Sequence, residues 1–201
     1  MWSSFGSTTD LHRIPGGTDP ITMVIHTCPP CGYSGYDDAF KRKSLDPALK
    51  ERVYKEITPL IKEFSVDPEW PYEFAPAERR YEFAAWIAEW QGESAQSIGD
   101  LYLRAAWCGH DSNDTEKERF YRLKALEYFR QAMEREEIPH EFVGVYTYLI
   151  GELYRRIGEV GAANVWYDQV VEAVKVYPKQ QWLVDLAAQQ KTNPKEKIGG
   201  D

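Results

Sequence analysis

The chain has 201 residues and a formal net charge of −8 at pH 7, with 43% hydrophobic and 14% aromatic residues. This composition is typical of a folded chain that is long enough for one domain with a real core. The acidic balance disfavours nucleic acids and anionic membrane surfaces, because like charges repel. No apolar run approaches the ~20 residues that span a bilayer. A protein or a peptide, neutral or basic, is the expected partner.

The N-terminal residues and the cysteines indicate in which cellular compartment the protein is found. The start of the chain has neither the basic residues nor the apolar stretch of a secretion signal. The cysteines are Cys28, Cys31 and Cys108, an odd number with one close pair, which is not typical of a secreted disulfide framework. The sequence therefore predicts a cytoplasmic protein.

Residues 1–44 differ in character from the rest because they are rich in Gly, Pro, Ser and Thr. Residues 21–27 (ITMVIHT) are mostly β-branched, which predicts a short strand leading into the cysteine pair. We expect a small β/loop cysteine-knuckle module here.

From residue 45 the hydrophobic period becomes helical. Asp46 can cap a helix and Pro47 can occupy its first turn, whereas Pro59 should kink or end it. Residues 45–75 are thus predicted to be a helix and a linker, followed by a helical repeat domain over 76–192 and a frayed tail over 193–201.

The helical domain shows a recurring pattern of small and aromatic residues. Residues 146–176 predict a helix, a tight turn at Gly158 and a second helix, with Gly151 and Ala163 where the two helices should touch. The same small–aromatic–small spacing occurs in Ala163, Tyr167 and Val170 and again in Ala125, Phe129 and Ala132, and more weakly over 80–110. The pattern predicts a mainly α, tetratricopeptide-like stack of antiparallel helix pairs with a period of ~34 residues. The alternative is an irregular helical bundle.

The sharpest chemical signal is Cys28-Pro-Pro-Cys31-Gly, which is half of a structural zinc site. Further ligands must complete the shell, and His26 and His12 are the candidates in the same module. A redox pair and a reduced pair without metal are the alternatives. A catalytic zinc is disfavoured because no nearby Glu/His motif supplies a general base.

The cysteine knuckle and the helical block together resemble a known family. The segments that carry the resemblance are CPPCGY, YEFAAWIAEWQG, LYLRAAW, ALEYFRQA and TYLIGELYRRIGE, over about residues 20–176. The combination resembles an uncharacterised prokaryotic family, the domain of unknown function 2225, in which a cysteine knuckle precedes tetratricopeptide-like helices. Many members carry a second CPxCG pair upstream, whereas this chain has no cysteine before Cys28, which gives His12 and His26 more weight as ligands. The resemblance implies no reaction.

In tetratricopeptide-type repeats the first helix of each pair lines the concave face, so the resemblance implies where a partner would bind. Trp86 and Trp90 lie four residues apart on one helix side, beside carboxylates, and would suit an apolar-basic peptide; the alternative is that both rings are core. The residues on this face are Glu82, Trp86, Glu89, Trp90, Tyr148, Glu152, Arg155 and Arg156.

We therefore expect a non-enzymatic protein–protein interaction module that binds a peptide and carries a structural zinc knuckle. The alternative is a zinc-dependent or thiol-redox enzyme that uses Cys28 and Cys31. The absence of a recognisable nucleophile–base set or phosphate loop counts against an enzyme.

Overall fold

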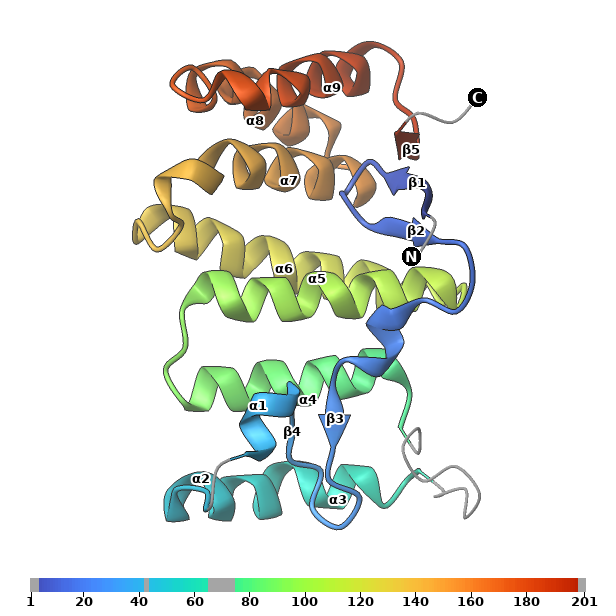
Figure 1. Cartoon of the computed structure of the whole chain (residues 1–201), viewed down its shortest axis with the longest axis vertical. Coiled ribbons are helices and arrows are strands. Elements are labelled where there is room, and N and C mark those ends of the chain that lie inside the picture. Colours follow the sequence, from blue (N-terminus) through green and yellow to red (C-terminus); the bar gives the residue numbers. More distant parts are fainter. Residues whose placement is uncertain (1–3, 42–43, 65–74, 199–201) are drawn as a thin grey trace. The chain divides into compact units, whose positions relative to one another are not determined.

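The computed structural model describes residues 4–41, 44–64 and 75–198. The chain forms two compact units, residues 19–125 and residues 1–18 with 126–201. We call the first the knuckle unit and the second the terminal unit. The protein is mainly α, as predicted (Figure 1). Within the described ranges, no helix is both long and apolar enough to cross a membrane. The tetratricopeptide-like description stays a prediction.

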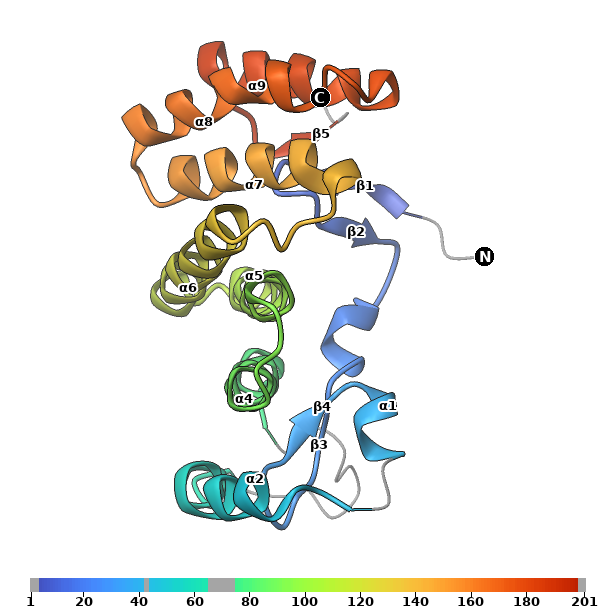
Figure 2. The same cartoon turned by 90° about the vertical axis from the view of Figure 1, so that its left-hand side faces the viewer.

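The knuckle unit combines short N-terminal elements with two long helices. Its α4 and α5 pack side by side, as Figure 2 shows end-on, and β4 packs against α4. Its elements are η1 (Pro20–Met23), β3 (His26–Thr27), β4 (Ser34–Gly35), α1 (Asp37–Phe40), α2 (Pro47–Arg52), the π-helical η2 (Val53–Ile57), α3 (Thr58–Ile61), α4 (Ala77–Trp90), α5 (Ala95–Asp111) and the first part of α6 (Thr115–Glu134).

Capping side chains explain where these helices begin. The Asp46 carboxylate accepts the N–H groups of Ala48 and Leu49, at 2.9 and 3.1 Å, and starts α2 as predicted. Ser94 starts α5 in the same way, by accepting the N–H of Ser97 at 3.1 Å. The turn between α4 and α5 uses Gly92 with φ of +71°, a conformation that favours glycine.

The strand predicted over residues 21–27 is wrong for most of its length, because Pro20–Met23 forms a 3-10 turn and only His26–Thr27 is a strand. Asp19 caps this turn by accepting the N–H of Ile21 at 2.9 Å. Arg80 of α4 then donates to the carbonyls of Thr22 and Ile25. A strand would need these carbonyls for hydrogen bonds to a neighbouring strand. Because the charged guanidinium occupies them, the segment does not extend as a strand.

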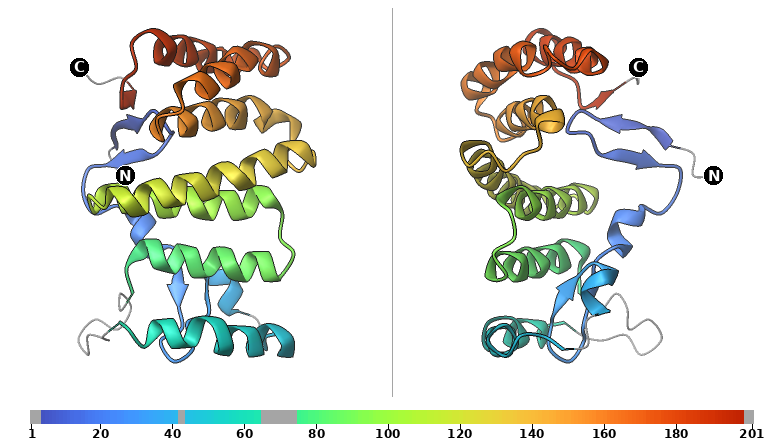
Figure 3. Two further views of the ribbon diagram at one scale, coloured as in Figure 1. Left: turned by 180° about the vertical axis from the view of Figure 1, so that it is seen from behind. Right: turned by 60° about the vertical axis from the view of Figure 1, so that its left-hand side comes forward.

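The terminal unit joins both ends of the chain to the last helices. Its small antiparallel sheet has the order β2-β1-β5, so the predicted frayed tail instead contributes a strand. Figure 3 shows α7, α8 and α9 packed side by side. The elements are β1 (Ser4–Thr8), β2 (Arg13–Pro15), the end of α6, η4 (His140–Phe142), α7 (Val143–Arg156), α8 (Val160–Ala173), η5 (Pro178–Gln180), α9 (Gln181–Thr192) and β5 (Lys197–Ile198).

These units replace the predicted division at residues 44, 75 and 192. Residues 4–18 do not belong with the cysteine pair, because β1 pairs with β5 and the hairpin joins the terminal unit. Residues 19–41 pack instead with α4 and α5. Of the predicted helix-and-linker segment over 45–75, residues 65–74 lie outside the described residues.

Gly151 of α7 sits where α7 and α8 meet, as predicted. A Cβ added there would lie 2.8 Å from two ring carbons of Tyr167, so only glycine admits the ring at this distance. Ala163 and Val170 are buried in the same core, which also includes Leu183 of α9. The turn between the helices uses Gly158 with φ of +92°.

Candidate functional site

The cysteine turn, residues 28–33, is a tight connection between β3 and β4. The Cys28 carbonyl accepts the N–H groups of Cys31 and Gly32, at 3.3 and 2.7 Å, and the Cys28 N–H donates to the Tyr33 carbonyl at 2.8 Å. The two cysteines are free, and each is half-buried. The structure therefore brings the predicted pair together at one turn.

The successive helical elements α2, η2 and α3, which we call the helical rod, pack against this turn. Gly32 has φ of +81°, and a Cβ built on it would lie 2.5 Å from Cγ2 of Ile57 and 2.9 Å from Cγ2 of Ile61. Thr58 donates its hydroxyl to the Cys31 carbonyl at 2.8 Å. Glycine is thus required here both for the backbone conformation and for the close contact.

Contacts at the sulfur of Cys31 have opposing effects on its pKa. Burial raises the pKa of the Cys31 thiol, and the hydrogen bond with the Cys28 thiol raises it further. The backbone N–H of Tyr33 donates to the sulfur and, with the positive charge of Lys50, lowers the pKa without restoring its usual value. Cys31 is therefore a protonated thiol at neutral pH, and its sulfur already faces a donor that would stabilise a thiolate.

The described residues do not gather a full set of zinc ligands around the cysteine pair. Among the described residues, no group of three or more His, Cys, Asp or Glu ligand atoms that all lie within 4.8 Å of one another includes Cys28 or Cys31. His26 is exposed, and its ring instead meets the edge of Phe40, with centroids 6.1 Å apart. His12 belongs to the terminal unit, where its backbone N–H donates to the hydroxyl of Thr8. The ligand role of His26 stays a prediction.

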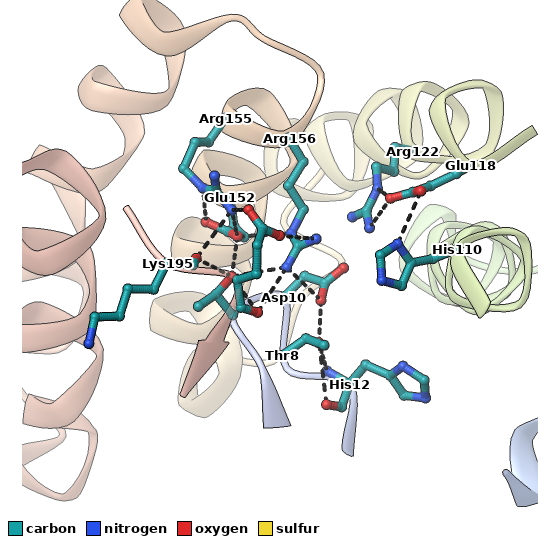
Figure 4. A network of polar contacts seen from close by, with 12 residues as sticks. Thr8, Asp10, His12, His110, Glu118, Arg122, Glu152, Arg155, Arg156 and Lys195 are labelled. Atoms are coloured by element: carbon teal, nitrogen blue, oxygen red, sulfur yellow. Dashed lines mark hydrogen bonds and ion pairs between the residues drawn. The ribbon is translucent and has the colours of Figure 1, made fainter. Parts of the chain in front are cut away.

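Cys108 and His110 lie two residues apart near the end of α5, and among the described residues neither belongs to a group of three close metal-ligand atoms. Cys108 is buried in α5, and burial raises the pKa of its thiol to about 12. His110 is exposed and lies 3.1 Å from the carboxylate of Glu118, which also pairs with Arg122 (Figure 4).

A groove of about 490 Å³ opens at the end of α4, and we call it the Trp90 groove. Trp90 is half-buried and lies under the guanidinium of Arg52, 4.4 Å from the ring centroid. Arg52 is also held by Glu56, with Nε and Oε1 2.9 Å apart. The groove is lined by Ser44, Leu45, Asp46, Ala48, Leu49, Arg52, Trp90, Gln91 and Glu93.

A second groove of about 420 Å³ lies between α4 and the β4–α1 segment. It shares Gln91 and Glu93 with the Trp90 groove, so both grooves border the α4–α5 turn. Its lining includes Tyr36 and Asp38, both exposed. The acidic side chains Asp38, Asp46 and Glu93 thus line these two grooves, and Arg52 is the basic residue among the described lining residues.

The predicted contact face on α4 is correct only in part. Trp86 is half-buried and packs edge-on against Phe83, with centroids 5.7 Å apart, while Glu89 is exposed. Glu82 is not available to a partner, because it is 5% exposed and accepts the hydroxyl of Tyr121 at 3.0 Å. The prediction for Glu82 is therefore wrong.

The predicted contact face on α7 is wrong, because its polar residues are bonded inside the terminal unit (Figure 4). Tyr148 and Glu152 are both 0% exposed. Glu152 accepts hydrogen bonds from Arg155 at 2.8 and 3.0 Å and from Arg156 at 2.9 Å. Tyr167 of α8 donates its hydroxyl to the same carboxylate at 2.6 Å.

This set of bonded residues, which we call the Glu152 network, also bonds the β1–β2 turn and the segment beside β5. Thr9 of the β1–β2 turn donates to Glu152, and its carbonyl accepts the hydroxyl of Tyr148 at 2.8 Å. Arg156 binds Glu196, beside β5, at 2.8 Å. Burial alone would raise the pKa of Glu196, but Arg156 and Arg155 outweigh it and lower that pKa. The network thus links α7 to β1 and β5, a role that no local pattern indicated.

The fold and the cysteine turn together define a mainly α protein that carries one two-cysteine turn. The chain belongs to the bacterial family described as uncharacterised protein conserved in bacteria (DUF2225), which it matches over residues 6–193, and this confirms the predicted resemblance. No curated protein and no solved structure matches the chain.

Proposed function

We propose that the protein is a non-enzymatic binding protein whose Trp90 groove holds an apolar-basic peptide. The observation that carries the proposal is a groove whose lining includes the half-buried ring of Trp90 together with the acidic side chains of Asp46 and Glu93. A half-buried ring of this size offers a partner a large apolar contact, and tryptophan is enriched among the residues that dominate binding energy.

The chemistry of the groove selects the peptide. Leu45, Leu49 and Trp90 can receive an apolar side chain, whereas Glu93 and Asp46 attract a lysine or an arginine. Arg52 does not offset this charge, because it is paired with Glu56 and stacked on the ring. The net charge of −8 favours basic partners at longer range.

The helix pairs support a tetratricopeptide-like architecture for this binding protein. In α7 and α8, Gly151 admits the ring of Tyr167, and Ala163 is buried between them. In α4 and α5, Ala85 and Ala105 are both 0% exposed. Small contact residues of this kind allow helices to approach closely and stack as repeats.

The cysteines favour this function over the thiol-redox alternative. A redox nucleophile needs a lowered pKa, whereas burial raises that of Cys31. Three free cysteines suit a reducing compartment, and we place the protein in the cytoplasm on that ground.

Binding can be measured by fluorescence anisotropy with a short fluorescein-labelled peptide of alternating leucine and lysine. A matched peptide with glutamate in place of lysine is the chemical control. We expect the lysine peptide to bind, with an affinity that falls as salt is added, and the glutamate peptide not to bind. Equal binding of the two peptides would contradict the proposed chemistry.

Two variants locate the site. Trp90→Ala should weaken binding at least tenfold, or about 1.4 kcal/mol, and Glu93→Lys should weaken it through charge alone. Glu172→Lys, on exposed α8 surface with 79% of the side chain accessible, is the matched charge control and should leave binding unchanged. If Glu93→Lys and Glu172→Lys have equal effects, the peptide does not bind in the Trp90 groove.

A further inference from the structure

We infer that the peptide proposed for the Trp90 groove also occupies the second groove, which we call the Tyr36 groove. The bound segment then carries two apolar side chains, one for each groove, with a lysine or an arginine between them at Glu93. This inference rests on the proposed function and adds to it the sequence pattern of the partner.

The two grooves border the same turn, between α4 and α5. Gln91 and Glu93 line both grooves, and both residues are exposed. Backbone hydrogen bonds order this turn, because Glu93 donates its N–H to the Ala88 carbonyl at 3.0 Å and Gln91 donates to the Ile87 carbonyl, also at 3.0 Å. One extended segment can therefore reach both grooves by crossing this turn.

The Tyr36 groove has the size and the lining to receive an apolar side chain. Its volume is about 420 Å³, within the range of about 300–1,000 Å³ that is typical of ligand pockets. Ala84 and Ala88 lie four residues apart on one side of α4, and their small side chains leave room in the lining. Leu101 of α5 and the exposed ring of Tyr36 offer larger apolar contacts. A leucine or an aromatic side chain of the partner can therefore bury its apolar surface here.

The charges of the lining place the basic residue between the two apolar ones. In the part of the chain that the structure describes, the Tyr36 groove is lined by Asp38 and Glu93 and by no basic side chain. Asp38 is offset by Lys41, whose Nζ lies 2.6 Å from its carboxylate. Asp46, in the Trp90 groove, is already engaged in capping α2.

Glu93 differs from these two carboxylates, because it forms no ion pair with any described residue. A partner's cation therefore gains a charge-assisted hydrogen bond there without breaking an existing one. Since Glu93 lines both grooves, a segment that binds it with one basic residue can place an apolar neighbour on either side.

The test compares fluorescein-labelled peptides that differ only in the second apolar residue, with the full-length protein and fluorescence anisotropy. The two-anchor peptides have a central lysine and a leucine on each side, separated from it by one, two or three serines, because an extended chain advances about 3.3–3.6 Å per residue. In each one-anchor peptide a serine replaces one of the leucines, so that length and charge are unchanged. We expect at least one two-anchor peptide to bind roughly tenfold tighter, or more, than both of its one-anchor counterparts.

Two tryptophan substitutions locate the second anchor. Ser97→Trp fills the Tyr36 groove from an exposed position in the first turn of α5, and should bring the two-anchor affinity down to that of the one-anchor peptides. Gln169→Trp, on the exposed surface of α8, is the matched control and should keep the gain. Far-UV circular dichroism checks that each variant keeps its helical signal.

Failure of this inference and failure of the proposed function give different results. If the one-anchor peptides bind but no two-anchor peptide gains affinity, the Trp90 groove acts alone, and only the inference is overturned. A gain that survives Ser97→Trp also overturns it, because the second leucine would then bind elsewhere. If no peptide binds, or if Trp90→Ala leaves the one-anchor affinity unchanged, the proposed function is overturned and the inference with it.

Discussion

The close contact at Gly151 makes a measurable prediction about how α7 and α8 pack. In Gly151→Ala, the new methyl group would meet two ring carbons of Tyr167 at 2.8 Å and the Cβ of Trp166 at 3.3 Å. The ring of Tyr167 cannot easily yield, because it is 2% exposed and its hydroxyl bonds Glu152 at 2.6 Å. Overpacking of this kind costs about 1–3 kcal/mol.

Alanine also has a higher helix propensity than glycine, which returns up to about 1 kcal/mol. A control must therefore separate the propensity from the contact. Gly161 lies in the first turn of α8, and a Cβ added to it meets nothing within 4 Å. We expect Gly161→Ala to be neutral or stabilising, and Gly151→Ala to lower the free energy of unfolding by up to about 2 kcal/mol.

Urea denaturation followed by far-UV circular dichroism measures both variants under one set of conditions. The two free energies of unfolding should differ by about 1–3 kcal/mol, with an unchanged dependence on urea, because the substitution is the same and only the contact differs. If Gly151→Ala were as stable as Gly161→Ala, α7 and α8 would not meet at this residue, and the close helix pairing would be refuted.

Three further predictions concern the Glu152 network and the glycine turns. Glu152→Gln keeps the shape of the side chain but removes the buried charge that faces Arg156, and should cost about 3 kcal/mol in the same denaturation assay; an unchanged stability would show that the charge is dispensable. The lowered pKa of Glu196 means that its stabilising contribution is present above its unfolded-state pKa, about 4.5, and is lost as the pH falls through the lower folded value. Thermal melts over this acidic range should therefore show a shallower loss of stability in Glu196→Gln than in the unmodified protein, and parallel curves would contradict the assignment. Gly32→Ala and Gly92→Ala both place alanine at positive φ, +81° and +71°, which costs about 1–2 kcal/mol, but only at Gly32 does the new Cβ also meet an isoleucine methyl at 2.5 Å. Gly32→Ala should therefore have the lower melting temperature of the two, and equal melting temperatures would show that the helical rod does not press on the cysteine turn.

Local signals predicted the helices well because they act over a few residues. Asp46 and Gly158 start and end helices through their own side chain and backbone, so the sequence around them is sufficient. At the start of α6 the local sequence is not sufficient. Thr115 with Glu118 has the spacing of a capping box, yet Asp114 accepts the N–H of Lys117 at 3.1 Å instead. Several adjacent residues can cap one helix, and the sequence does not rank them.

The elements that the sequence could not predict depend on distant contacts. Arg80 donates to Ile25 across 55 positions in the chain, and its bonds to this segment replace a strand that the β-branched residues favour locally. In the same way, β5 forms because β1 offers it an edge, with Ser7 opposite Ile198. The sequence of the tail has no helical period, so by itself it predicts fraying. Only the pairing with β1 shows that it forms a strand.

The contact face predicted on α7 is wrong for the same reason, because residues distant in the sequence cover it. This excludes α7 as a binding surface. A helical period places Glu152 and the two arginines that follow on one stripe, and a polar stripe usually faces water. Thr9, 143 positions away, covers this stripe instead, and the hydroxyl of Tyr167 completes the carboxylate's bonds. A carboxylate already engaged by these groups would have to break buried, charge-assisted bonds before it could accept a peptide's lysine. Of the residues predicted to contact a partner, those that remain available lie on α4, at the half-buried rings and at exposed Glu89. Peptide binding should therefore respond to charge reversal at the end of α4 and not to exposed substitutions in the terminal unit.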